Sequence, residues 1–75
     1  MTELVRYLAE AVVSHPENVE IHEEERDNEI IIKLSVAPDD MGKVIGKQGR
    51  IAKAIRTVVK SASYKSKKKY YVEIV

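Results

Sequence analysis

Two glycines three residues apart, Gly46 and Gly49, divide the most helix-like part of the sequence into two. Glycine adopts backbone conformations that other residues avoid, so the pair predicts a tight turn. Before the turn, apolar residues at helical spacing predict a short helix over residues 39–45, where two aspartates suit the positive end of a helix. After the turn, a second apolar stripe predicts a helix over residues 50–63. Any fold for this chain therefore has to accommodate two short helices joined by a tight turn.

Strand patterns lie on both sides of these two helices. Residues 30–36 are rich in β-branched side chains and alternate strongly, and residues 18–25 alternate more weakly. Turn-forming residues at 26–29 separate the two stretches and predict a hairpin. A last strand is predicted over residues 70–75. Because a helical crossover joins the second and third strands, they should be parallel if they are neighbours.

The N-terminal segment predicts a first helix over residues 2–14, capped by Thr2 and ended before Pro16. Its apolar face is expected to consist of Leu4, Val5, Leu8, Ala11 and Val12. The predicted order is then α-β-β-α-α-β, which indicates the α+β class. We expect a three-stranded mixed sheet with three helices packed on one face, in a single domain over residues 1–75.

Charge is divided unevenly along the chain. Residues 1–40 hold three cations and eleven anions, a net charge of −8, whereas residues 41–75 hold ten cations and one anion, a net charge of +9. The net charge of +1 therefore conceals a strongly basic second half. Such a division indicates a working surface for a polyanion. The alternative is that the two halves attract and screen each other in the fold.

Composition excludes several classes of function. The chain has no cysteine, which rules out disulfides, thiolate zinc sites and cysteine nucleophiles. No apolar run approaches the roughly 20 residues of a membrane span, and no signal-peptide pattern opens the sequence. We therefore expect a soluble cytoplasmic protein with no membrane insertion.

The glycine turn is the best candidate for chemistry. It would present the first N–H groups of the following helix, where an anion meets unpaired donors and the positive helix end. Lys47 lies within the turn, and Lys43 and Arg50 flank it. Cations spaced along a line suit a phosphodiester chain better than a small carboxylate. The alternative is an ordinary helix–helix turn in which glycine only ends a helix.

The run from Val44 to Arg50 (VIGKQGR), followed by Ala52 and Ile55, resembles a KH domain. KH domains clamp about four nucleotides of a single strand by their backbone at a GxxG loop. The predicted element order matches the type II arrangement of that fold, and the resemblance extends over nearly the whole chain. With one such domain and this length, the chain is similar to the small bacterial KhpA family of RNA-binding proteins.

Carried onto this sequence, the resemblance implies a non-catalytic site for single-stranded RNA, with no cofactor, metal or small-molecule substrate. Lys47 and Gln48 would contact phosphates, and Ile45, Ala52 and Ile55 would form an apolar floor for the bases, with Ile32 or Leu34 contributing. The implied RNA-binding residues are Lys43, Ile45, Gly46, Lys47, Gln48, Gly49, Arg50, Ala52, Lys53, Ile55 and Arg56. The KH pattern has a larger aliphatic residue in place of Ala52, so we expect a shallow floor. No clear aromatic platform is evident, so base stacking is not expected to dominate.

Three other features allow more than one interpretation. The basic connector, defined as Lys65, Lys67, Lys68 and Lys69, either extends the phosphate track or is a solvated loop. The acidic residues at 23–29 are typical of an exposed strand, because no enclosing pocket for acid/base chemistry or cation binding is implied. His15 and His22 lack a further ligand at a metal-binding spacing.

The resemblance also implies partners and a role. Proteins of the family associate with themselves and with a larger KH-containing partner of the KhpB type, act as RNA chaperones or post-transcriptional regulators, and are linked to cell elongation and cell-wall homeostasis. A hypothesis of another class is a dimerising interaction module with incidental RNA binding, whose apolar contacts would be Tyr7, Val13, Ile31 and Tyr71. An acidic-site enzyme using Glu24 is a third hypothesis, and nothing in the spacing supports it.

Overall fold

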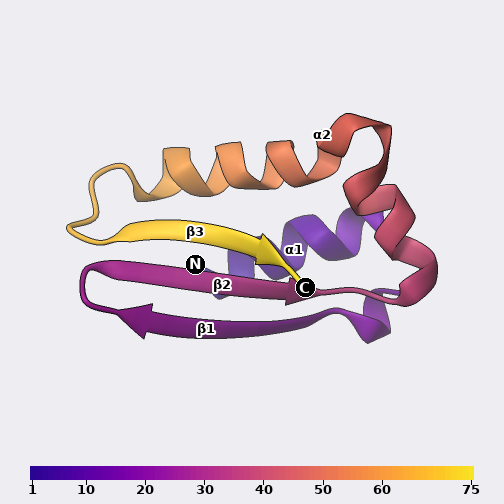
Figure 1. Cartoon of the computed structure of the whole chain (residues 1–75), viewed down its shortest axis with the longest axis horizontal. Helices are drawn as coiled ribbons and strands as arrows, with labels where there is room; N and C mark the ends of the chain where they lie inside the picture. The colour runs from indigo at the N-terminus through magenta and orange to yellow at the C-terminus, as the bar shows by residue number, and fades with distance from the viewer.

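A computed structural model describes residues 1–75, apart from the side chain of Lys47. The elements are α1 (Thr2–Val12), a 3-10 helix η1 (Pro16–Asn18), β1 (Glu20–Arg26), β2 (Glu29–Ser35), α2 (Pro38–Ser63) and β3 (Lys69–Ile74). Figure 1 shows the three strands side by side, with α2 running along the sheet beyond β3. Among the described residues, neither α-helix has an apolar stretch of the length that a bilayer crossing requires.

The sheet has the order β1-β2-β3 and is mixed, as predicted. β1 and β2 are antiparallel, and Arg26 pairs with Glu29, so Asp27 and Asn28 form a two-residue hairpin loop. β2 and β3 are parallel, with Ile30 beside Tyr70. The predicted hairpin and the parallel crossover are therefore both confirmed. The first strand begins two residues later than predicted because residues 16–18 form η1.

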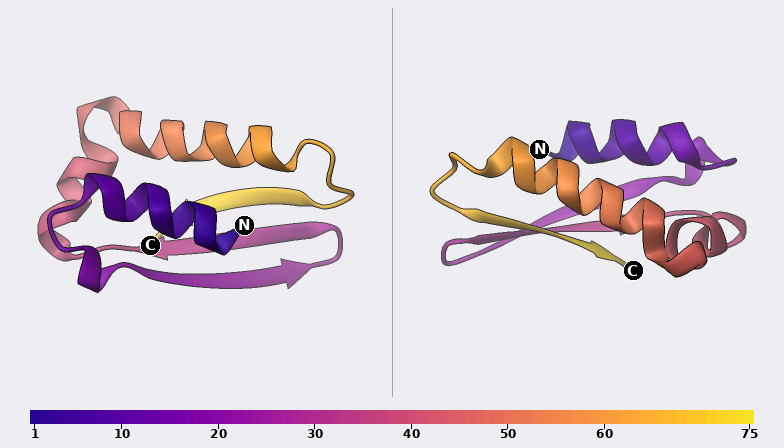
Figure 2. Two further views of the ribbon diagram at one scale, coloured as in Figure 1. Left: turned by 180° about the vertical axis from the view of Figure 1, so that it is seen from behind. Right: turned by 90° about the horizontal axis from the view of Figure 1, so that it is seen from above.

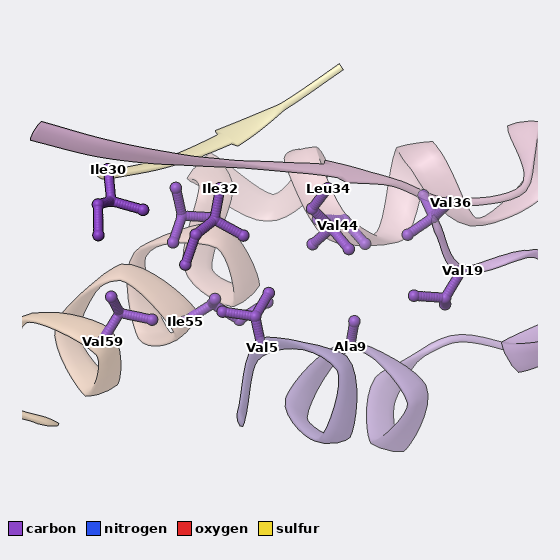
Figure 3. Close-up of a cluster of buried hydrophobic side chains, with 11 residues drawn as sticks. Val5, Ala9, Val19, Ile30, Ile32, Leu34, Val36, Val44, Ile55 and Val59 are labelled. Atoms are coloured by element: carbon purple, nitrogen blue, oxygen red, sulfur yellow. The ribbon is translucent and has the colours of Figure 1, made fainter. Parts of the chain in front are cut away.

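Both helices cover the same face of the sheet, and the core lies between them and β2 (Figure 3). Alternate residues of β2 point into this core, as its β-branched pattern predicts. The core cluster consists of Val5, Ala9, Val19, Ile30, Ile32, Leu34, Val36, Val44, Ile55, Val59 and Val72. The views in Figure 2 show that the opposite face of the sheet carries no helix.

The first helix differs from its prediction at both ends. Thr2 is its first helical residue rather than its cap, and the helix ends at Val12 rather than Ser14. Val5 and Ala9 face the sheet, one helical turn apart, while Val12 is exposed. The helix thus contacts the sheet through residues spaced four apart, and the small side chain of Ala9 permits close packing. The predicted positions of Ala11 and Val12 in the apolar face were wrong.

The two predicted helices around the glycines form one long helix, α2, of 26 residues. Its backbone is interrupted where Gln48 and Gly49 have φ values of 63° and 69°. This left-handed pair divides α2 into an N-terminal arm and a C-terminal arm, which meet at the bend seen in Figure 1. With α1, the two arms give three helical segments and the expected α-β-β-α-α-β order. The interruption begins at Gln48 rather than at Gly46, whose φ is not positive.

The C-terminal arm buries a narrower stripe than its sequence predicts. Ala52, Ile55 and Val59 are buried, and they follow one another at spacings of three and four residues. Val58 and Ala62 are exposed, although both belong to the apolar stripe that predicts this helix. A single row of buried side chains suffices because this arm covers only one margin of a three-stranded sheet.

Candidate nucleic-acid interface

The left-handed pair Gln48–Gly49 lies on an open part of the surface. Gln48 is exposed, and Gly46 and Gly49 are half-buried. A Cβ atom placed on either glycine would meet no described atom within 4 Å, so the described part of the protein leaves the turn uncrowded. Consecutive residues in right- and left-handed conformations arrange successive N–H groups into a concavity that suits an anion. The start of the C-terminal arm adds the positive end of a helix.

The predicted cations around this turn have different surroundings. Arg50 and Lys53 are exposed and form no ion pair with any described residue. Lys43 instead donates to Ser14 Oγ, and its Nζ lies 3.7 Å from Asp40 Oδ1. Arg56 donates through Nε to the Val72 carbonyl of β3 at 3.2 Å. The predicted phosphate contact of Lys47 falls on a side chain outside the part of the structure that is described.

The predicted apolar floor is divided between surface and core. Ile45 is 53% exposed and lies one helical turn before Gly49, where a base could contact it. Ala52 and Ile55 are buried, and Ile32 and Leu34 are completely buried beneath the helices. The structure thus brings Ile45, Gln48, Arg50 and Lys53 to the surface around the turn. It places Ala52 and Ile55 behind that surface, where they hold the C-terminal arm on the sheet.

A buried carboxylate links the N-terminal arm of α2 to the segment after α1. Asp40 has no exposed surface, and its two carboxylate oxygens accept hydrogen bonds at 2.9 Å from the backbone N–H groups of Ser14 and His15. These bonds, the Ser14 bond above all, hold the pKa of Asp40 below its ordinary value, although burial opposes the shift. Asp40 therefore accepts hydrogen bonds from the segment after α1 rather than from its own helix, and it ties the two segments together.

Sequence reasoning missed this link because its partners are 25 and 26 residues away. The only local signal is an aspartate three residues before Lys43 on the same helical face. That spacing indicates an ion pair along a helix and says nothing of Ser14 or His15.

Two acids of the hairpin, Glu24 and Glu25, form ion pairs with neighbouring cations. Glu24 accepts from Arg26 Nε at 2.7 Å and pairs with Lys33 Nζ at 3.0 Å. The Lys33 hydrogen bond, followed by that of Arg26, lowers the pKa of Glu24. A general acid that works at neutral pH needs a raised pKa, so the lowered pKa of Glu24 does not suit that role. Among the residues that the structure describes, no three His, Asp or Glu side chains gather in a way that could hold a metal ion.

A three-stranded mixed sheet, helices on one face and an open GxxG turn between two helical arms together define a KH domain of the α-β-β-α-α-β type. The chain belongs to the KhpA/KhpB KH domain family, which matches residues 2–74. This family is a nucleic-acid-binding rather than an enzyme family.

Curated relatives match along all or nearly all of their length. The chain is 59% identical over 75 residues to a protein of Caldanaerobacter subterraneus subsp. tengcongensis and 57% identical over 75 residues to one of Clostridium perfringens, in both cases covering 100% of each chain. It is 52% identical to a Listeria monocytogenes protein, covering 100% of this chain and 99% of the relative. Each of these three proteins is named RNA-binding protein KhpA.

Proposed function

We propose that this protein binds single-stranded RNA without catalysing a reaction, and that it clamps the sugar–phosphate backbone at residues 46–49. The observation that carries the proposal is the uncrowded left-handed pair Gln48–Gly49 at the start of a helical arm. Family membership supports it, since the relatives are named as RNA-binding proteins. The proposed working place is the cytoplasm, where such RNA is found.

In the proposed mechanism, the turn amides bind phosphate oxygens and exposed cations lengthen the track. Gln48, Arg50 and Lys53 contact phosphates, together with Lys47. Ile45 provides the accessible apolar contact for a base, while Ala52 and Ile55 support it from behind. Lys43 holds the N-terminal arm through Ser14, and Arg56 holds the C-terminal arm on β3. Backbone contacts of this kind give salt-dependent affinity with weak sequence preference.

The tetranucleotide UUUU tests this mechanism, because it is long enough only for the clamp. In ¹⁵N-labelled protein, we expect its addition to shift the amide resonances of residues 45–53. Arg50→Ala or Lys53→Ala should each weaken binding about threefold to tenfold and reduce the slope of log K against log salt by about 0.7. Lys65→Ala removes the same charge far from the turn and should change neither quantity. Shifts confined to β1 and β2 would overturn the clamp.

We further propose that the protein acts as an RNA chaperone or post-transcriptional regulator beside a larger KhpB-type partner, with a link to cell elongation and cell-wall homeostasis. Membership of a family that spans KhpA and KhpB supports this role. A physical reason for pairing also exists. One shallow site binds weakly, whereas two linked sites raise each other's effective concentration.

A dimerising interaction module remains the second candidate function. Tyr7 is 71% exposed on α1 and Tyr71 is 46% exposed on β3, so two of the predicted apolar contacts are available to a partner. Ile31 is half-buried, and Val13 packs against the core. Sedimentation at increasing protein concentration, with and without RNA, separates the two candidates. A tight RNA-free dimer that cannot bind UUUU favours the interaction module, and a protein that stays monomeric at every concentration, with and without RNA, excludes it.

A further inference from the structure

A second recess lies at the other end of the C-terminal arm. A pocket of about 670 Å³ opens between that arm, the connector after it and β3. In Figure 1, these three segments meet at the end of the molecule that is opposite to the bend in α2. Lys69 N donates to the Asn28 carbonyl at 2.8 Å and so anchors the connector to the hairpin. The volume is within the range of small-molecule sites, about 300–1,000 Å³.

The pocket wall combines apolar and aromatic surface. Val59 and Val72 line it and are themselves buried, so they form its base. Three of the four tyrosines also line it, namely Tyr64, Tyr70 and Tyr71. Tyr64 is 77% exposed, and its ring carries the Lys65 ammonium at 5.9 Å from the centroid. Exposed aromatic rings around an apolar pocket floor suit a nucleobase, because every nucleobase has a face that can stack on an aromatic ring. This is the aromatic surface that was not evident in the sequence.

The charge of the pocket is positive. Among the described residues that line it, five are cations and none is acidic. Lys60, Lys67 and Lys69 form no ion pair with any described residue. Lys68 forms an ion pair with Glu25 of the hairpin. Free ammonium groups beside aromatic rings match the phosphate and the base of one nucleotide.

A row of cations connects this pocket to the glycine turn. Lys53, Arg56 and Lys60 are spaced at i, i+3 and i+7, so they share one face of the C-terminal arm. At about 1.5 Å per residue, the arm places Lys60 roughly 17 Å from Gly49 along its axis. Arg56 and Lys60 also line the pocket. A strand held at the turn and running along this face would reach the pocket beyond its first four nucleotides.

We propose that the pocket binds a further nucleotide of the same RNA strand, with its base against Tyr64 and its phosphate against Lys60 and Lys67. The proposal rests on the proposed RNA function and extends it to strands longer than the clamp. It assigns the connector to the RNA track rather than to a solvated loop. A free mononucleotide offers the same chemistry without the connecting row of cations, and it is the alternative that the experiment separates.

The test compares the RNA oligomers U4 and U10 by fluorescence anisotropy. The parent protein should bind U10 at least tenfold more tightly than U4. Tyr64→Ala should lower the U10 affinity about tenfold and leave U4 binding unchanged. Tyr7→Ala, which removes an exposed tyrosine outside the pocket, should affect neither oligomer. Lys67→Ala should reduce the U10 salt slope by about 0.7, whereas Lys33→Ala, which removes a cation of β2 outside the pocket lining, should not.

The outcomes separate this inference from the function on which it rests. Absence of U4 and U10 binding by the folded parent would contradict the RNA function itself. Binding of U4 with no gain for U10, or a gain that survives both Tyr64→Ala and Lys67→Ala, would overturn the pocket alone. Binding of UMP that needs Tyr64, with no gain for U10, would assign the pocket to a mononucleotide and also overturn the proposal. Circular dichroism of each variant confirms that it is folded.

Discussion

Replacing Gly46 and Gly49 together by aspartate is expected to abolish RNA binding while the protein remains folded. Both positions have room for a side chain, since a Cβ on either meets nothing within 4 Å. Gly46 has no positive φ, so an aspartate there adopts an ordinary helical conformation. Gly49 has a φ of 69°, where aspartate is tolerated better than most residues at a cost of about 1 kcal/mol. We therefore expect the melting temperature to fall by about 4–8 °C.

The loss of binding comes from charge placed where phosphates would lie. Two carboxylates at the turn would repel the RNA backbone and compete for the amides that bind it. We expect the affinity for U10 to fall at least a hundredfold, measured by anisotropy at a salt concentration common to all variants.

The matched control is the double variant Gly46→Asn and Gly49→Asn. Asparagine has the same shape as aspartate without the charge, and it also tolerates the left-handed conformation. It should lose no more than about tenfold in affinity. If the aspartate variant, folded by circular dichroism, bound U10 as tightly as the parent, the clamp at residues 46–49 would be wrong. Equal losses in both double variants would show that shape rather than charge controls the site.

The elements that the sequence predicts well are those whose signal is local. The β-branched alternation of residues 30–36 predicts β2 and its buried face, because strand periodicity depends only on neighbouring side chains. The glycine spacing predicts a break between two helical arms. It does not predict that Gln48 rather than Gly46 adopts the left-handed conformation. That choice depends on how the N-terminal arm, whose Val44 is buried in the core, packs against the rest of the fold.

The less predictable features depend on how distant segments meet. Helical periodicity groups Ala52 and Ile55 in one apolar stripe of the C-terminal arm, and both are buried. It does not predict that the apolar Ile45, at the end of the N-terminal arm, is exposed. The tyrosine-lined pocket likewise forms only when the connector folds back on β3, so the separate tyrosines carry no sequence signal for it. The Asp40 link also joins segments that are distant in the sequence, so no local pattern predicts it.

Asp40→Asn is expected to lower the melting temperature at pH 7 by about 10 °C or more. The carboxylate offers one acceptor to each of two backbone N–H groups, those of Ser14 and His15, at 2.9 Å. An asparagine side chain has a single oxygen, so its NH₂ group would face one of these donors and leave it unpaired. An unpaired donor in a site without solvent destabilises the folded state far more than loss of a surface contact. Thermal unfolding followed by circular dichroism measures the change.

Asp39→Asn provides the control, because it removes the same charge from the adjacent residue. The Asp39 side chain is 87% exposed and lies 3.8 Å from His15 Nε2, so its loss should move the melting temperature by no more than about 2 °C. Equal melting temperatures for the two variants would mean that the Asp40 link does not stabilise the fold.

The stabilisation of the folded protein by Asp40 should depend on pH. The pKa of Asp40 is lower in the folded protein than in the unfolded chain, where it is about 3.9. The unfolded chain therefore takes up this proton first as pH falls, and the contribution of Asp40 is complete above that value. This contribution is lost as pH falls through the lower folded pKa.

The gap in melting temperature between the parent and Asp40→Asn should stay constant from pH 7 to about 5 and narrow below about 4. Glu24, whose pKa is also lowered, is present in both proteins and cancels from the difference. A gap that widened under acid conditions would contradict this prediction. A protonated carboxyl group carries an O–H on one oxygen, so it cannot accept hydrogen bonds well from both N–H groups.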